Sequence, residues 1–366
     1  MATVYLLATS DIVTDQRVHR SALTLVEAGH NVYVVGRRLK STPPQFTRAY
    51  GVQLFYIPFA RGILFYLTYN LRVIAYLLLR RVDLIYANDL DTLLGAGVIS
   101  FVRRKNLVYD SHELFTELPE LVHRRVKRWL WQLLERMMIR RVSIGITVSA
   151  SIAHELRSRY GKEFSVVRNV PMARGSVMIA PTGVNTIIYQ GALNVGRGLE
   201  KLVAAMQYVD NANLVIAGTG DIEDMLIGLA RELGLTSKIR FTGRLSSNDL
   251  FVETSKATLG VSLEEDLGLN YRFALPNKLF DYIQAGIPVL VSNLPEMANL
   301  VHNYDVGQTI AWNCSVEHLA YSLNQLLHDN IKQNYYREMA AKAAKELCWE
   351  KESLLFLSAL KSVVSV

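Results

Sequence analysis

Residues 189–206 read YQGALNVGRGLEKLVAAM, and they indicate the fold more clearly than any other stretch of the chain. They predict a buried strand ending at Gly191, a short loop containing Gly196 and Gly198, and a helix directly after it. The backbone N–H groups of such a loop and the N-terminus of such a helix suit a phosphate group. Arg197 can bind a diphosphate through two hydrogen bonds, although a glycine-rich turn with a solvated arginine would show the same residues.

The same alternation of short apolar runs and helical stretches extends through the chain. It is typical of parallel sheets covered by helices. Between the first two strands, Asp15 to Ala28 predicts a helix closed by Gly29, which completes one βαβ unit. We therefore expect an α/β chain with two Rossmann-like sheets. The predicted strands cover residues 3–9, 31–36, 52–58, 84–88, 106–111 and 144–149 in the first half, and 186–191, 213–218, 238–243, 257–263 and 287–292 in the second.

The length of the chain allows two domains. It has 366 residues, and 50% of them are hydrophobic, which is enough to bury two cores. Residues 170–185 contain two prolines and two glycines without hydrophobic periodicity, so we predict the linker there. We expect a first domain at 1–170, a second at 171–350, and a final helix within 351–366 that packs back on the first domain.

Positive charge is concentrated in the first half. The formal net charge is +7, and residues 1–170 carry 24 lysines and arginines against 13 acidic residues, whereas residues 171–366 carry 16 against 20. A basic domain indicates an anionic partner, either nucleic acid or an acidic membrane surface. Because no nucleic-acid recognition motif accompanies the charge, we expect no nucleic acid as a partner.

Three features bear on the compartment. Cys314 and Cys348 are too few for a disulfide framework and lack metal-ligand spacing, which fits a reducing cytoplasm. The first 15 residues contain no basic leader and read as a buried strand. The longest apolar stretch, residues 63–79, contains Asn70 and Arg72, either of which is costly at the centre of a bilayer. We expect a cytoplasmic protein with a buried or interfacial helix at 63–79.

A second informative stretch is LPNKLFDYIQAGIPVLVS, residues 275–292. It predicts a helix that begins after Pro276 and ends at Gly286, with Lys278 and Asp281 in its first turns. A carboxylate at this place can accept the paired hydroxyls of a ribose, or it can simply complement the helix dipole.

These segments together resemble a known family. YQGALNVGRGLEKL (189–202), FTGRLSSNDL (241–250) and PNKLFDYIQAGIPVLVS (276–292) closely resemble the donor-binding domain of retaining GT-B glycosyltransferases of family 4. In the first half, VTDQRVHRSALTLVEAGHNVYVV resembles the family's first βα unit, and YANDLDTLLGAG and YDSHELFTE resemble its fourth and fifth strand ends. The resemblance covers nearly the whole chain and implies a GT-B fold, with two Rossmann-like domains facing a central cleft.

The resemblance also implies a donor site. Arg197 matches a basic residue placed on the donor diphosphate, and Asp281 matches the second Glu of the E-x7-E motif, which holds the nucleotide ribose. Phe273 stands where that motif has its first Glu, so we assign Glu265 of the preceding loop to the catalytic set, with Glu264 and Asp266 as alternatives. The expected donor-binding residues are Gly191, Arg197, Gly218, Asn277, Lys278 and Asp281.

In the first domain, the loop SDIVTDQR lacks the glycines with which family members approach the donor phosphate. We assign Asp11, Asp15 and Asp89 to the acceptor side, with helix capping as the alternative for Asp15. Arg17 either faces the acceptor or is solvated.

Two strand ends carry further candidates. The sequence NDLD superficially forms a D-x-D metal motif through Asp89 and Asp91, but its place at a strand end favours cleft lining or helix capping, and we predict no metal ion and no cofactor. By resemblance, His112 and Glu113 join the catalytic set on the acceptor or donor-sugar side, with a structural histidine as the alternative.

Residues 121–141, LVHRRVKRWLWQLLERMMIRR, predict an amphipathic helix with a basic polar face. Such a helix suits the surface of an anionic membrane, or it covers the sheet and leaves only its basic side in solvent. We expect peripheral contact with the inner face of the membrane through this segment.

The resemblance implies transfer of a sugar from a UDP-, GDP- or ADP-sugar to a glycan or lipid-linked acceptor, with retention at the anomeric carbon. A nucleotide-sugar 2-epimerase of the same fold is one alternative. A non-catalytic sugar-nucleotide binder is another, because Phe273 replaces an expected Glu.

Overall fold

The chain divides into two compact units. The computed structural model describes residues 1–40, 42–43, 46–60, 62–175 and 183–364. Unit 1 comprises Met1–Asn169 and Glu352–Val366, and unit 2 comprises Val170–Lys351. Of the predicted linker at 170–185, residues 176–182 lie outside the described residues.

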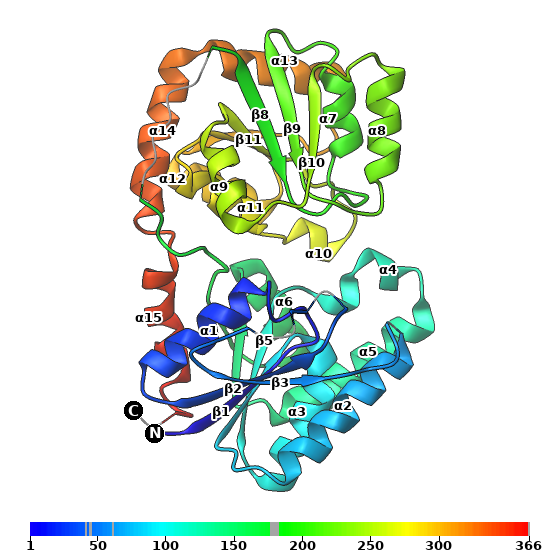
Figure 1. Cartoon of the computed structure of the whole chain (residues 1–366), viewed down its shortest axis with the longest axis vertical. Coiled ribbons are helices and arrows are strands. Elements are labelled where there is room, and N and C mark those ends of the chain that lie inside the picture. Colours follow the sequence, from blue (N-terminus) through cyan, green and yellow to red (C-terminus); the bar gives the residue numbers. More distant parts are fainter. Residues whose placement is uncertain (41, 44–45, 61, 176–182, 365–366) are drawn as a thin grey trace. The chain divides into compact units, whose positions relative to one another are not determined.

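Unit 1 is built on a parallel sheet of seven strands in the order β3-β2-β1-β4-β5-β6-β7 (Figure 1). Strands β2 and β3 lie on one side of β1, and strands β4 to β7 lie on the other. The strand order therefore reverses between β1 and β4. In such sheets, ligands bind outside the carboxyl ends of the strands at the reversal. The strands are β1 (Thr3–Leu7), β2 (Asn31–Arg37), β3 (Gly51–Phe55), β4 (Leu84–Asn88), β5 (Asn106–Ser111), β6 (Ile144–Thr147) and β7 (Phe164–Val166).

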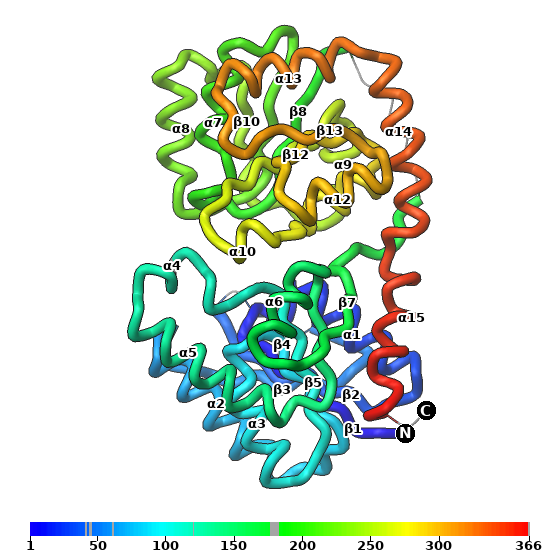
Figure 2. Tube along the Cα trace, turned by 180° about the vertical axis from the view of Figure 1, so that it is seen from behind, coloured from blue at the N-terminus to red at the C-terminus, as the bar shows by residue number. Residues whose placement is uncertain are grey.

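Helices cover both faces of this sheet. In both views α2, α3 and α5 lie on one face, and α1 and α15 lie on the other (Figures 1 and 2). The α-helices are α1 (Gln16–Glu27), α2 (Ile63–Leu78), α3 (Leu90–Arg103), α4 (Pro119–Val122), α5 (Arg125–Met138), α6 (Ala150–Tyr160) and α15 (Trp349–Leu360), and single 3-10 turns occupy Phe115–Glu117 and Ile139–Arg141. No helix within the described part of the chain is long and apolar enough to span a bilayer.

Unit 2 repeats the architecture with six parallel strands in the order β10-β9-β8-β11-β12-β13. Its reversal lies between β8 and β11. The strands are β8 (Asn185–Gln190), β9 (Ala212–Ala217), β10 (Ile239–Gly243), β11 (Leu259–Ser262), β12 (Val289–Ser292) and β13 (Gly307–Ile310). The helices are α7 (Leu199–Ala205), α8 (Glu223–Glu232), α9 (Ser247–Ser255), α10 (Leu269–Arg272), α11 (Asn277–Gln284), α12 (Pro295–Tyr304), α13 (Val316–His328) and α14 (Asn330–Ala344).

Local sequence explains where two informative helices begin and end. Asp15 caps α1 by accepting the backbone N–H of Val18, and Gly29 follows the helix at φ 84°, as the sequence predicts. Likewise α11 begins after Pro276, and Gly286 follows it at φ 69°. The sequence did not predict β7, which has three residues, or β13, which reads GQTI and lacks an apolar run.

The last helix, α15, carries the chain from one unit into the other. At its start, the N–H of Trp349 donates to the carbonyl of Pro171 in unit 2. Further on, the buried Glu352 pairs with Arg168 of unit 1 and also accepts that residue's backbone N–H at 2.9 Å. Phe356 then enters the core of unit 1, with its ring centroid 6.0 Å from that of Tyr86. The helix therefore completes unit 1.

We expect Phe356→Ala to destabilise unit 1 by about 3 kcal/mol, because truncating a buried phenylalanine leaves a cavity in the core. Phe356 is 1% exposed, whereas Leu354 on the same helix is 63% exposed. Urea unfolding of the Phe356→Ala and Leu354→Ala variants measures the effect. Equal stability of the two variants would show that α15 only rests on the surface.

Candidate functional site

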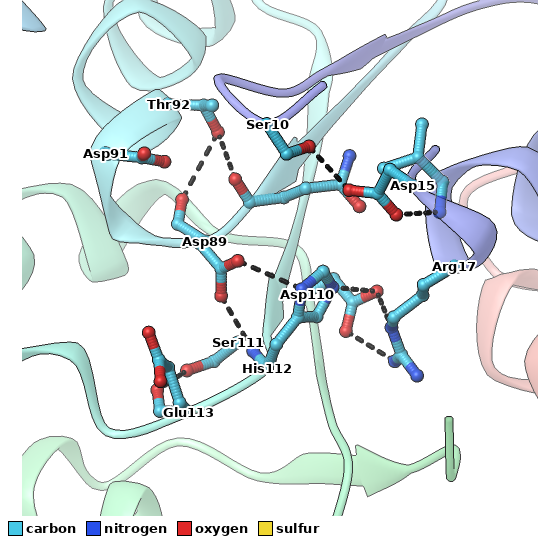
Figure 3. Close-up of polar contacts among 12 residues, drawn as sticks. Ser10, Asp15, Arg17, Asp89, Asp91, Thr92, Asp110, Ser111, His112 and Glu113 are labelled. Carbon is cyan, nitrogen blue, oxygen red and sulfur yellow. Dashed lines mark hydrogen bonds and ion pairs between the residues drawn. The ribbon is translucent and has the colours of Figure 1, made fainter. Parts of the chain in front are cut away.

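In unit 1, polar side chains gather where three neighbouring strands end (Figure 3). Thr9 follows β1, Asp89 follows β4, and His112 follows β5. Strands β1, β4 and β5 are adjacent in the sheet, so these side chains meet at the reversal of strand order. We call them, with the residues that bind them, the unit 1 site.

Asp89 fixes the imidazole of His112. Its Oδ1 accepts the backbone N–H of His112 at 2.9 Å, and its Oδ2 lies 2.9 Å from the ring Nδ1. The other ring nitrogen, Nε2, lies 3.2 Å from Oδ2 of Asp110. Asp89 adopts φ 60°, a backbone conformation that is uncommon for residues with a side chain. The ring is thereby held between two carboxylates.

Behind His112, Asp110 forms a buried ion pair with Arg17 of α1. The guanidinium donates to both carboxylate oxygens, at 2.7 and 2.9 Å, and also to the carbonyl of Val167 at 3.0 Å. The hydroxyl of Tyr86 donates to the same carboxylate at 2.7 Å. Arg17 is 3% exposed, so the alternative of a solvated side chain is wrong. This pair connects α1 to the carboxyl ends of β5 and β7.

The charges around His112 decide what it can do chemically. Burial lowers the pKa of its imidazole, but the carboxylates of Asp89 and Asp110 outweigh burial and raise this pKa to about 10. Burial raises the pKa of Asp110, but Arg17 and His112 outweigh burial and hold it well below the usual range. At neutral pH His112 is therefore an imidazolium whose charge can stabilise negative charge nearby. It cannot serve as a general base there.

A third carboxylate of unit 1 lies next to this cluster. Asp91, in the first turn of α3, accepts a hydrogen bond from the hydroxyl of Thr9. Burial, followed by the charge of Asp89, raises the pKa of Asp91 to about 7. Across the described residues, no group of three or more His, Cys, Asp or Glu side chains is placed to share a metal ion.

The other predicted residues of unit 1 lie in the same loops. Asp11 accepts the backbone N–H of Val13 at 3.1 Å, which stabilises the turn after β1. Asp15 is the N-cap of α1, which is the capping alternative considered for it, and it also accepts from the hydroxyl of Ser10. Glu113 is half-buried, and its carbonyl accepts the hydroxyl of Ser111 at 2.9 Å. Asp11, Asp15 and Glu113 thus follow the ends of β1 and β5 within a few residues. Asp11 and Asp15 stabilise the turn and the helix in which they lie.

In unit 2, two basic side chains converge on one buried carboxylate at the reversal of strand order. Glu264, two residues after β11, is 0% exposed. Its Oε1 lies 2.9 Å from Nζ of Lys278 and 3.3 Å from a terminal guanidinium nitrogen of Arg197. Its Oε2 accepts the hydroxyl of Ser262 at 2.7 Å. We call this cluster the unit 2 site.

Aromatic rings surround the two cations. Nζ of Lys278 lies 4.0 Å from the ring centroid of Tyr189, and the guanidinium carbon of Arg197 lies 5.0 Å from that of Tyr271. Burial raises the pKa of Glu264, but Lys278 and Arg197 outweigh burial and lower it to about 2. Two positive charges therefore share one negative charge, and the surplus of positive charge favours an anionic ligand.

Close packing of the glycine-rich loop explains how Arg197 reaches Glu264. Gly198 adopts φ 67°, and a Cβ atom there would lie 2.3 Å from the carbonyl oxygen of Leu263. At Gly218, a Cβ atom would lie 1.9 Å from the carbonyl oxygen of Gly191. A side chain at Gly198 would push the loop away from the end of β11, and one at Gly218 would push apart the ends of β8 and β9. The glycines predicted from sequence thus allow the loop to lie directly on the end of β11.

Asp281 belongs to a neighbouring hydrogen-bond network. Its Oδ2 accepts from Nε2 of Gln190 at 2.8 Å, and Oε1 of Gln190 accepts the hydroxyl of Thr254 at 2.7 Å. A small pocket opens beside this network. Residues from the segment before β8, from β8 itself and from helices α9 and α11 line it: Arg174, Gln190, Ser247, Leu250, Phe251, Thr254 and Asp281.

Of the three acidic residues weighed as substitutes for the missing Glu, Glu264 is the one that contacts the basic pair. Glu265 is half-buried, and its backbone N–H donates to the carbonyl of Gly196 at 2.9 Å. Asp266 pairs with Arg272 at 2.8 Å. Asn277 is exposed as the first residue of α11.

The site residues predicted from sequence did not include several side chains on which the two clusters depend. These residues are Asp110, Gln190, Thr254 and Ser262, whereas Glu264 was predicted as an alternative to Glu265. The sequence indicates three of them as site candidates, because Asp110, Gln190 and Ser262 are polar residues at the carboxyl ends of otherwise apolar strands.

Two doubly wound parallel sheets in one chain are the architecture of the GT-B class of two-domain α/β proteins, and here each sheet carries a charged cluster at its reversal of strand order. Two sequence profiles match it side by side. The profile described as Glycosyltransferase Family 4 matches residues 15–171, and the profile described as Glycosyl transferases group 1 matches residues 178–345. The chain therefore belongs to the GT-B glycosyltransferases of family 4 (group 1), and the predicted fold class is confirmed.

Individual proteins show the same relationship. An uncharacterized glycosyltransferase of Methanocaldococcus jannaschii is 27% identical over 172 residues, which make up 46% of this chain and 41% of that protein. The chain spans about half the length of the curated relatives it matches. Among solved structures, sucrose-phosphate synthase from Thermosynechococcus elongatus aligns with a TM-score of 0.82, 16% identity and 99% coverage of both chains. HepE of Anabaena in complex with UDP-glucose aligns with a TM-score of 0.77 and 16% identity, covering 99% of this chain and 100% of that one.

We expect Glu264→Gln to destabilise unit 2 by about 3 kcal/mol, because it leaves the buried Lys278 without a carboxylate. Glu265→Gln is the matched control and should change the free energy of unfolding by less than about 0.5 kcal/mol. Chemical denaturation of both variants measures the difference. A larger effect at Glu265 would reverse the roles assigned to the two residues.

The raised pKa of His112 predicts a pH dependence of stability. A histidine with a raised pKa contributes stability that is full below its ordinary pKa of 6.5 and is lost as the pH rises toward about 10. The wild type should therefore lose stability above neutral pH more steeply than His112→Gln. Thermal denaturation above pH 7.5 isolates this effect, because the raised pKa of Asp91, about 7, lies below that range. Parallel curves for the two proteins would contradict the assigned ion pairs.

Proposed function

We propose that this protein transfers a sugar from a nucleoside diphosphate sugar to a hydroxyl group of a glycan or lipid-linked acceptor in polysaccharide biosynthesis. The observation that carries the proposal is the convergence of Arg197 and Lys278 on Glu264 at the reversal of strand order in unit 2. Membership of the family and the binding of UDP-glucose named for HepE support a nucleotide-sugar donor.

The proposed role of the basic pair is electrostatic. When the bond between sugar and diphosphate breaks, negative charge develops on the leaving phosphate, and preorganised cations stabilise it. Glu264 holds both cations in place before the donor arrives, so little reorganisation is needed at the moment of reaction. The proposed reaction uses these side chains and requires no metal ion or other cofactor.

Asp281 is proposed to hold the donor's ribose. Its carboxylate is already oriented by Gln190, which in turn is held by Thr254, and one carboxylate can accept both ribose hydroxyls. The donor base, whether uracil, guanine or adenine, would lie beyond the ribose.

Unit 1 is proposed to receive the acceptor. His112, as an imidazolium held by Asp89 and Asp110, can place positive charge beside a sugar or phosphate oxygen. Asp11 and Asp89 can accept hydrogen bonds from acceptor hydroxyls. We propose retention of the anomeric configuration, which the ¹H coupling constant of the product's anomeric proton measures.

Donor binding will raise the melting temperature if the unit 2 site is correctly assigned. A thermal-shift screen with UDP-, GDP- and ADP-sugars should identify one nucleotide that stabilises the wild type. Arg197→Ala and Asp281→Ala should lose most of that shift, because each removes a direct contact to the donor. Arg231→Ala, an exposed residue of α8, is the control and should keep it. Equal shifts in all four proteins would place the donor elsewhere.

Turnover distinguishes the proposed transferase from its two alternatives. We expect nucleoside diphosphate to be released only when an acceptor is present. Conversion of the donor to a second sugar nucleotide without acceptor would indicate an epimerase. Donor binding without turnover across a broad acceptor panel would indicate a binding protein.

A further inference from the structure

Helix α5 turns its apolar side to solvent. Val126, Trp129, Leu133 and Met137 are between 41% and 72% exposed. Helical spacing places them on one side of the helix, and Glu135, the helix's buried residue, lies on the opposite side. The interpretation that this apolar face covers the sheet is therefore wrong.

Helix α2 shows the same inversion. Leu64, Leu67, Leu71 and Leu78 are between 40% and 55% exposed and follow one stripe along the helix. The opposite side packs into unit 1, with Phe65, Tyr69, Val73 and Leu77 among its buried residues. Four leucines in one exposed stripe are more than the scattered apolar residues of an ordinary protein surface.

The two helices are neighbours. The ring centroids of Tyr66 on α2 and Trp131 on α5 lie 5.1 Å apart, with the rings edge to face. Both views show α2 and α5 side by side on unit 1 (Figures 1 and 2). We call their two exposed stripes together the α2–α5 surface.

Basic side chains border this surface, and neither helix exposes an acidic side chain. Arg125 and Arg136 flank one side of the α5 stripe, and Lys127 flanks the other; all three are exposed. Arg72 is the single charged residue of α2, and the single acidic residue of α5 is the buried Glu135.

Not every arginine of the segment is available for binding. Arg128 donates to the carbonyl of Thr116 at 3.0 Å and pairs with Glu117 at 2.6 Å, so it anchors α5 to the loop after β5. Variants that neutralise Arg128 would disturb the fold and cannot test the surface.

We propose that the α2–α5 surface docks on a lipid bilayer that contains anionic lipid. Exposed leucine and tryptophan side chains can enter the boundary between headgroups and acyl chains, while the flanking arginines and lysine contact anionic headgroups. The absence of exposed acidic side chains on both helices complements a negatively charged surface. The proposal rests on unit 1 alone and does not depend on the proposed function.

The charge requirement is tested by flotation of the full chain with vesicles of phosphatidylcholine, with and without phosphatidylglycerol. The wild type should float only with the anionic vesicles. The double variant Arg125→Gln/Arg136→Gln should bind roughly 30-fold more weakly, since each basic residue near an anionic surface contributes about fivefold. The control, Arg231→Gln/Lys361→Gln, removes the same charge from exposed positions outside both helices and should bind as the wild type does.

The apolar requirement is tested on each helix separately. Leu67→Gln/Leu71→Gln on α2 and Trp129→Gln/Leu133→Gln on α5 should each reduce flotation and keep the melting temperature, because these side chains are exposed. The control, Ile331→Gln/Leu354→Gln, changes even more exposed apolar residues elsewhere and should float normally.

Several results would overturn the proposal. These are no flotation of the folded wild type, equal flotation with neutral vesicles, or equal flotation of the surface and control variants. Light scattering adds a further outcome. A wild-type dimer that fails to float and dissociates in the Trp129→Gln/Leu133→Gln variant would show that a second copy covers the surface instead.

Discussion

Each unit buries a carboxylate near the carboxyl end of a central strand and neutralises it with basic side chains from distant parts of the chain. In unit 1 Asp110 binds Arg17, and in unit 2 Glu264 binds Lys278 and Arg197. Removing one partner from such a pair is costly, because it leaves a charge without water or a counterion. The loops that carry the remaining site residues are therefore fixed to the sheets by charge as well as by packing.

The two clusters leave different charges available to a ligand. In unit 1, Asp110 is satisfied by Arg17 and Tyr86, and His112 presents a positive ring that Asp89 also contacts. In unit 2, a single carboxylate serves two cations, so positive charge remains in excess. An anionic ligand thus finds a stronger attraction in unit 2, as expected if that unit binds a diphosphate.

Local sequence rules predicted most of the strands and the ends of α1 and α11, because capping residues and glycines act within a few positions. They could not distinguish Glu264 from Glu265, since successive residues point to different sides of a loop whose path depends on packing against Gly196 and Gly198. They predicted the amphipathic pattern of α5 but left both orientations of its apolar face open. A pattern shows that a helix has two faces, and only tertiary contacts, such as those of Glu135 with Tyr109 and Tyr160, show which face is inside.

The path of α15 has a consequence for synthesis on the ribosome. Glu352 and Phe356 complete the core of unit 1, yet they are translated after all of unit 2. Domains generally fold as their sequences emerge, the N-terminal one first. Here the surface around Tyr86 stays uncovered by Phe356 while some 180 residues of unit 2 are added, as the span Val170–Lys351 requires. The core of unit 1 around Tyr86 is therefore completed only after the residues of unit 2 have been synthesised.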